Sequence, residues 1–164
     1  MTTLMPRGGN DRIYTPDDLA AKVVHAFSSE ISGRVLEPCA GGGAFVRALQ
    51  RLGHDPIALE IDRGTDFFEY REPVDWIVTN PPWSKSRKFL AHSYTLAPNI
   101  LVLMNLIHLF CLRCRMREML DAGFGPRRIV LYDNPPKPWP QSGFQLGAIH
   151  IQRGYTGGTE WRRG

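Results

Sequence analysis

Cysteine is scarce in this sequence: there are three in 164 residues, Cys39, Cys111 and Cys114. An odd and small number argues against a disulfide framework and favours a reducing compartment. Cys111 and Cys114 have the spacing of half a zinc site, but no second Cys or His pair stands at a matching distance. We therefore expect no bound metal.

Long apolar runs are also lacking. The longest, residues 100–112, is too short and too interrupted to cross a bilayer, and the N-terminus has no apolar segment of secretory type. Neither sign of charge dominates, since 20 Lys and Arg against 16 Asp and Glu give a net charge of +4. We expect a cytoplasmic protein without a membrane partner, and the small positive excess is compatible with a polyanionic partner.

The length leaves no room for two domains of ordinary size. We expect residues 1–12 to form a flexible tail and residues 13–164 to form a single domain.

Apolar patterns predict strands that alternate with helices. The expected strands are residues 34–37, 56–62, 74–79, 99–105, 128–132 and 145–152. The expected helices are one that begins at Pro16 with Thr15 as its N-cap, followed by residues 44–52, 86–96 and 113–122. This order predicts an α/β fold with a mostly parallel sheet, helices on both faces and an antiparallel pair at the C-terminal edge.

A glycine run, Gly41 to Gly43, separates the first strand from the following helix. Glycines at this point allow a sharp turn and close approach of a ligand at the carboxyl ends of the strands. Glu60 follows the second strand, where an acid can grip a ribose diol, and Asp62 is nearly as suitable. Either acid can instead be solvated at a strand end, and the glycine run alone also fits a dinucleotide site or a plain turn.

Asp66 and Phe67 precede the third strand. The carboxylate can accept a hydrogen bond from an adenine amino group while the ring packs on the purine face. The alternative is a turn residue followed by a core aromatic residue.

The tetrapeptide Asn80-Pro81-Pro82-Trp83 closes the third strand. The Asn80 side-chain carbonyl and the Pro81 backbone carbonyl can accept the two N–H bonds of an aromatic amine, and two prolines hold these acceptors rigidly. Trp83 can stack on the base that carries the amine. The alternative is a proline-rich turn with a core tryptophan.

Three cations, Lys85, Arg87 and Lys88, come directly after this tetrapeptide. Their position makes them candidates for contact with nucleic acid, although such clusters are commonly solvated faces.

These motifs together resemble the N6-adenine DNA methyltransferases in which the cofactor motif precedes the catalytic tetrapeptide. The match rests on Tyr14-Thr15-Pro16, on residues 37–45 (acid, Pro, two residues, Gly-x-Gly, aromatic) and on residues 80–83. The later part of the chain resembles the end of small phage-type adenine methyltransferases. The resemblance implies a class I methyltransferase fold with a seven-stranded sheet and S-adenosylmethionine as cofactor.

By the same resemblance, Thr15 contacts the methionine part of the cofactor, Glu60 the ribose and Asp66 the adenine amine. The implied cofactor-binding residues are Tyr14, Thr15, Glu37, Pro38, Cys39, Ala40, Gly41, Gly43, Glu60, Ile61, Asp66, Phe67 and Asn80. The implied catalytic residues are Asn80, Pro81, Pro82 and Trp83.

The resemblance implies DNA as the partner, with RNA as the alternative, and the host cytoplasm as the location for a phage-encoded chain. Larger relatives carry a separate target-recognition domain, for which this chain has no room. Target recognition would then depend on residues 84–88 and 134–143, on a partner subunit or on a homodimer. Parts of the pattern also fit a glutamine methyltransferase, a non-catalytic cofactor-binding subunit and a nicotinamide oxidoreductase.

Overall fold

The computed structural model of the chain describes residues 13–110, 113–139, 141, 143 and 145–164, so the expected tail, residues 1–12, lies outside the described residues. The helices are α1 (Asp17–Ala26), α2 (Ala44–Arg51), α3 (Ser86–Leu96), α4 (Ile107–Phe110) and α5 (Arg113–Asp121). The strands are β1 (Val35–Glu37), β2 (Ile57–Ala58), β3 (Trp76–Thr79), β4 (Asn99–Asn105), β5 (Phe124–Tyr132), β6 (Leu146–Arg153) and β7 (Glu160–Arg163). Among the described residues, no helix is long and apolar enough to cross a membrane.

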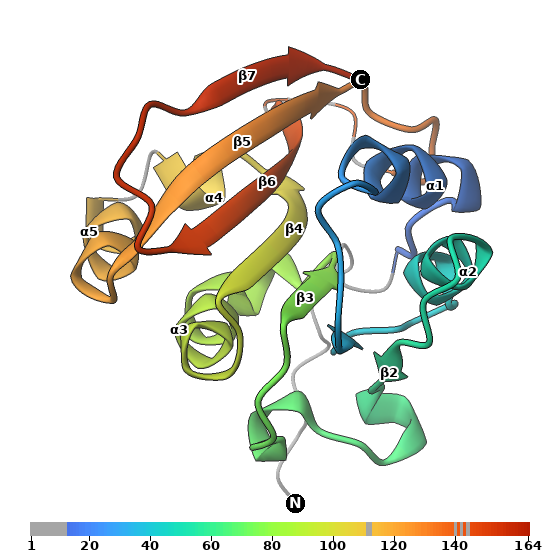
Figure 1. The fold of residues 1–164 in the computed structure, drawn as a ribbon. Helices are drawn as coiled ribbons and strands as arrows, with labels where there is room; N and C mark the ends of the chain where they lie inside the picture. The colour runs from blue at the N-terminus through green and yellow to red at the C-terminus, as the bar shows by residue number, and fades with distance from the viewer. Residues whose placement is uncertain (1–12, 111–112, 140, 142, 144) are drawn as a thin grey trace, which may run out of the picture.

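The strands form one sheet in the order β2-β1-β3-β4-β6-β5-β7 (Figure 1). β6 runs antiparallel to its neighbours β4 and β5, whereas the other adjacent pairs are parallel. The predicted fold class is therefore confirmed. The apolar pattern did not locate β7, which lies outside β5 and occupies the edge of the sheet.

Helices cover both faces of the sheet (Figure 1). The side chains of β4 explain this arrangement, because they point alternately into two apolar cores, one on each face of the sheet. Leu101 and Leu103 pack with α1 and α2, whereas Ile100, Val102 and Met104 pack with residues of α3 and α5. All five are fully buried, as expected for a central strand with helices on both sides.

β5 begins at Phe124, four residues before the predicted start, and two further predicted boundaries, both beside the candidate site, are wrong. α1 begins at Asp17 with Pro16 as its N-cap, because the Thr15 hydroxyl bonds to a distant side chain and does not cap the helix. The second strand ends at Ala58, well short of residue 62. Residues 61–63 instead form a 3-10 turn, which the Glu60 carboxylate caps through the Asp62 amide and Gly64 closes at φ +85°.

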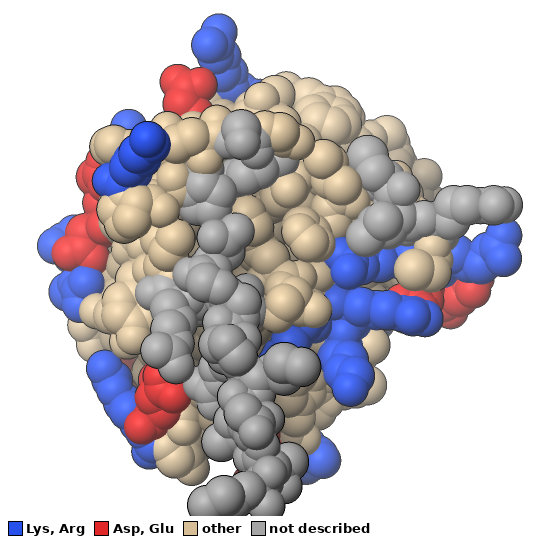
Figure 2. Space-filling model, turned by 180° about the vertical axis from the view of Figure 1, so that it is seen from behind, with Lys and Arg blue, Asp and Glu red and all other residues tan. Residues whose placement is uncertain are grey.

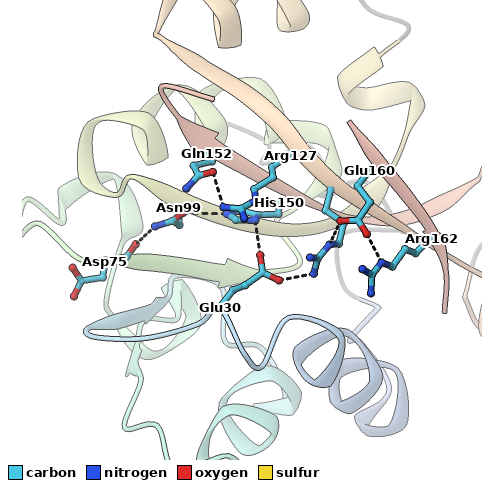
Figure 3. Close-up of polar contacts among 9 residues, drawn as sticks. Glu30, Asp75, Asn99, Arg127, His150, Gln152, Glu160 and Arg162 are labelled. Atoms are coloured by element: carbon cyan, nitrogen blue, oxygen red, sulfur yellow. Dashed lines mark hydrogen bonds and ion pairs between the residues drawn. The ribbon is translucent and has the colours of Figure 1, made fainter. Parts of the chain in front are cut away.

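A partly buried polar network lies toward the amino end of β4, away from the carboxyl ends of the parallel strands (Figure 3). Glu30, in the loop after α1, forms an ion pair with Arg128 of β5, and Arg128 also bonds to Glu160 of β7. His150 of β6 bonds through Nε2 to the Asn99 side chain at 3.1 Å. Burial, together with nearby arginines, lowers the pKa of His150 to about 4. The network fastens the loop after α1 to the C-terminal strands.

Candidate active site

A cavity of about 640 Å³ opens where the carboxyl ends of β1, β2 and β3 meet. This volume is within the range of about 300–1,000 Å³ that small-molecule sites occupy. Most of the residues implied for cofactor binding or catalysis line it: Tyr14, Thr15, Pro38, Cys39, Ala40, Gly41, Glu60, Ile61, Asp66, Phe67, Asn80, Pro81, Pro82 and Trp83. The fold therefore brings three separate motifs to one place.

The glycine loop makes a tight turn from β1 into α2. Gly41 and Gly43 have φ angles of +49° and +83°, a conformation that other residues adopt only with strain. Gly43 is the N-cap of α2, and its amide donates to the Ala40 carbonyl at 2.7 Å. A Cβ on Gly41 would lie 2.9 Å from the ring of Tyr14, so the absence of a side chain lets Tyr14 lie against the loop.

Carboxylates line the side of the cavity next to this loop. Glu60 accepts hydrogen bonds from the Gly41 amide at 2.6 Å and from the Asp62 amide at 3.2 Å. Asp66 accepts from the Phe68 amide at 2.9 Å and so fixes the turn that carries Phe67. Glu60, Asp62 and Asp66 all contribute to the lining, which makes this side suited to a cationic ligand with hydroxyl groups.

The Asn80 side chain is held at both ends. Its Nδ2 donates to the Thr15 hydroxyl oxygen at 3.0 Å, and its Oδ1 accepts from Trp83 Nε1 at 3.1 Å. The indole N–H can only donate, so it must face the carbonyl oxygen, whereas the hydroxyl can accept from the amide nitrogen. These two contacts determine which way the amide points, and a carbonyl oxygen keeps a second lone pair for another donor.

Trp83 is half-buried between two other rings. Its ring centroid lies 6.0 Å from that of Trp139, in an edge-to-face arrangement, and 5.9 Å from that of His108. Arg115 fixes His108, because its Nη1 lies 2.9 Å from His108 Nδ1 and donates to the His108 carbonyl at 2.6 Å. An arginine cannot accept, so Nδ1 must be the acceptor and the ring proton is on Nε2.

Two residues implied for cofactor binding support the cavity from outside it. Gly43 shapes the turn into α2, and Glu37 is only 1% exposed. A carboxyl oxygen of Glu37 accepts from the Cys39 amide at 2.9 Å, and burial raises the pKa of this carboxyl to about 8. Burial likewise raises the pKa of the Cys39 thiol. Both groups therefore stay protonated at neutral pH, and Glu37 fixes the start of the loop through the Cys39 amide.

The three candidate cations have different surroundings. Lys85 lines the cavity, whereas Arg87 and Lys88 lie on the exposed side of α3, outside it. Arg87 forms an ion pair with Glu118 of α5.

Several residues of the cavity were not among the expected cofactor-binding or catalytic residues, and Trp139, which lay only within the loop 134–143 proposed for target recognition, matters most. It is 4% exposed and lies in the proline-rich segment after β5, far along the chain from Trp83. The one signal in the sequence was a tryptophan among turn-forming residues. The remaining lining residues to which no cofactor, catalytic or recognition role was assigned are Ile13, Gly42, Ala44, Phe45, Phe68 and Phe89.

No protein-family model and no curated protein matches the sequence. Solved structures do match the fold. A proposed RNA methyltransferase from Pyrococcus horikoshii has a TM-score of 0.63 and 13% identity over 91% of both chains. A proposed class I S-adenosylmethionine-dependent methyltransferase from Listeria monocytogenes has a TM-score of 0.64 and 9% identity, over 93% of this chain and 66% of that chain.

The M protein of the type I restriction enzyme EcoKI has a TM-score of 0.64 and 15% identity. The match covers 89% of this chain but 45% of the EcoKI chain, so this chain spans less than half the length of that protein. At these identities the comparisons establish the fold, and the seven-stranded sheet of this chain is that of class I S-adenosylmethionine-dependent methyltransferases.

Proposed function

We propose that this protein is an S-adenosylmethionine-dependent methyltransferase that methylates the N6 amine of adenine in DNA. The observation that supports this most strongly is that Gly41 and Asn80 line the same cavity. Direct transfer between two bound molecules requires that both be held together in one site, which lowers the entropic cost of their encounter.

The glycine-loop side of the cavity suits the cofactor. S-adenosylmethionine supplies, when bound, an electrophilic methyl group on a sulfonium, and it also carries an ammonium group. Glu60 would accept hydrogen bonds from the ribose hydroxyls, and Asp66 from the adenine amino group, with Phe67 against the purine face. The carboxylates also attract the positive charges of this ligand.

Asn80 would prepare the base amine for attack. The lone pair of an adenine N6 amine is delocalised into the ring, so the amine is a poor nucleophile. If its two N–H groups donate to Asn80 Oδ1 and to the Pro81 carbonyl, the nitrogen becomes more pyramidal and its lone pair points outward. Oδ1 can accept the second donor because the Trp83 indole uses only one of its lone pairs.

Trp83 would hold the base. Extruding a base from a duplex costs a few kcal/mol, and stacking on an aromatic ring returns about 1–3 kcal/mol. The hydrogen bond to Asn80 sets the plane of the indole, and Trp139 and His108 limit its motion. With the base held in this way, the cofactor, when bound, would supply its methyl group to the amine nitrogen and depart as the neutral thioether, and the amine would release a proton to solvent.

The choice of DNA rests on the resemblance of residues 14–16, 37–45 and 80–83 to N6-adenine DNA methyltransferases. RNA is the second candidate, because the Pyrococcus protein proposed as an RNA methyltransferase matches this chain over 91% of both lengths. For target recognition we propose a partner subunit or a second copy of this chain, because the structures similar in fold include the EcoKI M protein and a type I restriction–modification complex.

The test is transfer of labelled methyl groups from S-adenosylmethionine to separate DNA, RNA and protein pools. We expect label in DNA as N6-methyladenine, loss of transfer in Asn80→Ala with retained cofactor binding, and normal transfer in the exposed amide control Gln50→Ala. Label in RNA alone would show that the substrate is RNA. Unchanged turnover of Asn80→Ala would refute the role of Asn80.

A further inference from the structure

Helices α3 and α5 lie side by side next to Trp83, and an ion pair joins them. Arg87 Nε donates to the two carboxylate oxygens of Glu118 at 2.8 and 3.1 Å, and Arg87 Nη2 also bonds to Glu118. The Arg87 hydrogen bond lowers the pKa of the Glu118 carboxyl. Each charge thus compensates the other, and Arg87 is not available as a free cation.

The remaining charges on these two helices are mainly positive. Lys88 of α3 and Arg117 of α5 are exposed, as is Lys85 just before α3, and none of the three forms a salt bridge with any residue that the structure describes. Asp121 is the exposed acid at the end of α5. Figure 2 shows Lys and Arg side chains gathered on the side of the molecule where α3 and α5 lie.

This cationic surface is continuous with the cavity. Lys85 belongs to both, because it lines the cavity directly after Trp83. On the α5 side, Arg115 contacts His108, whose ring lies 5.9 Å from that of Trp83. Positive charge therefore begins at the tryptophan and extends outward along the two helices.

The side of the cavity next to the glycine loop has the other sign, since Glu60, Asp62 and Asp66 line it. A polyanion is repelled there and attracted at α3 and α5, so charge alone selects the direction of approach. An acidic protein or an anionic membrane would meet the same cations, but neither brings a base to Trp83.

We infer that Lys85, Lys88 and Arg117 form a docking surface for the phosphate backbone of nucleic acid, by which a strand is laid across Trp83. This inference rests on the proposed function and describes how its substrate reaches the cavity.

The experiment measures binding of the full chain to a labelled duplex and a labelled single strand from 50 to 200 mM salt, with no cofactor present. Lys88→Ala and Arg117→Ala should each weaken binding about 3- to 10-fold and reduce the slope of log K against log salt by about 1. Arg34→Ala, an exposed cation before the amino end of β1, is the matched control and should leave both quantities unchanged.

Glu118→Gln provides a test in the opposite direction. It should release Arg87, tighten binding and steepen the salt slope by up to about 1, because one cation is no longer compensated. The inference would be overturned if Arg34→Ala and Arg117→Ala lost equal affinity for nucleic acid, or if Glu118→Gln gained none. Tighter binding to phosphatidylserine vesicles or to polyglutamate than to either nucleic acid would also overturn it.

The two proposals can fail separately. If the parent protein shows the expected salt slopes but transfers no methyl group to any pool, the docking surface stands and the proposed reaction is wrong. If the protein methylates DNA while Lys88→Ala and Arg117→Ala bind as the parent does, the reaction stands and the surface is wrong.

Discussion

Replacing Thr15 with valine removes a single hydrogen bond that orients the Asn80 amide. Valine keeps the branched shape of threonine but cannot accept from Asn80 Nδ2, which lies 3.0 Å from the Thr15 hydroxyl. The amide then has one orienting contact left, the hydrogen bond from Trp83 Nε1 to Oδ1. Conformers in which Asn80 Nδ2 faces the base then become more populated. In these conformers the Asn80 side chain cannot accept a hydrogen bond from the amine of the base.

The size of the effect follows from the bond that is lost. A typical intramolecular hydrogen bond contributes about 0.5–1.5 kcal/mol net, which corresponds to about a 2- to 12-fold decrease in rate. The loss should fall in kcat, because the oriented carbonyl acts on the amine in the transition state. Thr15→Ser retains the hydroxyl and should keep most of the parental rate.

The assay is steady-state methyl transfer to DNA, with kcat and the KM for S-adenosylmethionine determined separately and with thermal unfolding as a check on folding. The resemblance implied a different role for Thr15, contact with the methionine part of the cofactor, and that role predicts a raised KM at unchanged kcat. If Thr15→Val has the same kcat as the parent, whether or not its KM is raised, the idea that Thr15 orients Asn80 is refuted.

Two further predictions concern stability. Glu37 has a pKa of about 8 in the folded protein, above its ordinary value of 4.5. Between these two pH values the folded state holds a proton that the unfolded state has lost. The contribution of Glu37 to the free energy of unfolding therefore falls as pH rises from about 4.5 to 8. Glu37→Gln should reduce the difference in the free energy of unfolding between pH 5 and pH 8.5, measured by urea unfolding, by on the order of a few kcal/mol. The same difference in the variant as in the parent protein would contradict this. Glu30→Gln removes one partner of the mostly buried pair with Arg128 and should lower the free energy of unfolding by about 2–3 kcal/mol, because Glu160 still compensates the arginine. A loss below about 0.5 kcal/mol, as is usual for surface substitutions, would show that the network in Figure 3 is not a stabilising one.

Much of the fold followed from local patterns because burial imposes a period on the sequence. The prediction for residues 99–105 matches β4, whose side chains alternate between two cores. β7 could not be found in this way, since Glu160, Trp161 and Arg162 pair with β5 through the backbone while their side chains are largely exposed. Edge strands of this kind carry no apolar period to detect.

The composition of the candidate site was also predictable where a motif and a strand end coincide. Gly41, Glu60 and Asn80 each follow a strand, and the carboxyl ends of neighbouring parallel strands meet at one edge of the sheet. Contacts between distant segments were not predictable. The local signal at Thr15 favoured an N-cap, because Ser and Thr before a helix commonly bond to its first amides.

The expected role of Thr15 differs from the observed one because its hydroxyl can either cap α1 or accept a hydrogen bond from Asn80, and the structure shows the second contact. Pro16 is the N-cap and its side chain cannot accept a hydrogen bond, so the first turn of α1 has no side-chain cap while the Thr15 hydroxyl contacts Asn80. Asn80 lies in the cavity wall, where an amide with no fixed partner would rotate freely and present the wrong atom to a base. The hydroxyl thus fixes Asn80 and does not cap the helix, and this one contact links the N-terminal motif to the tetrapeptide of residues 80–83 across 65 residues of chain.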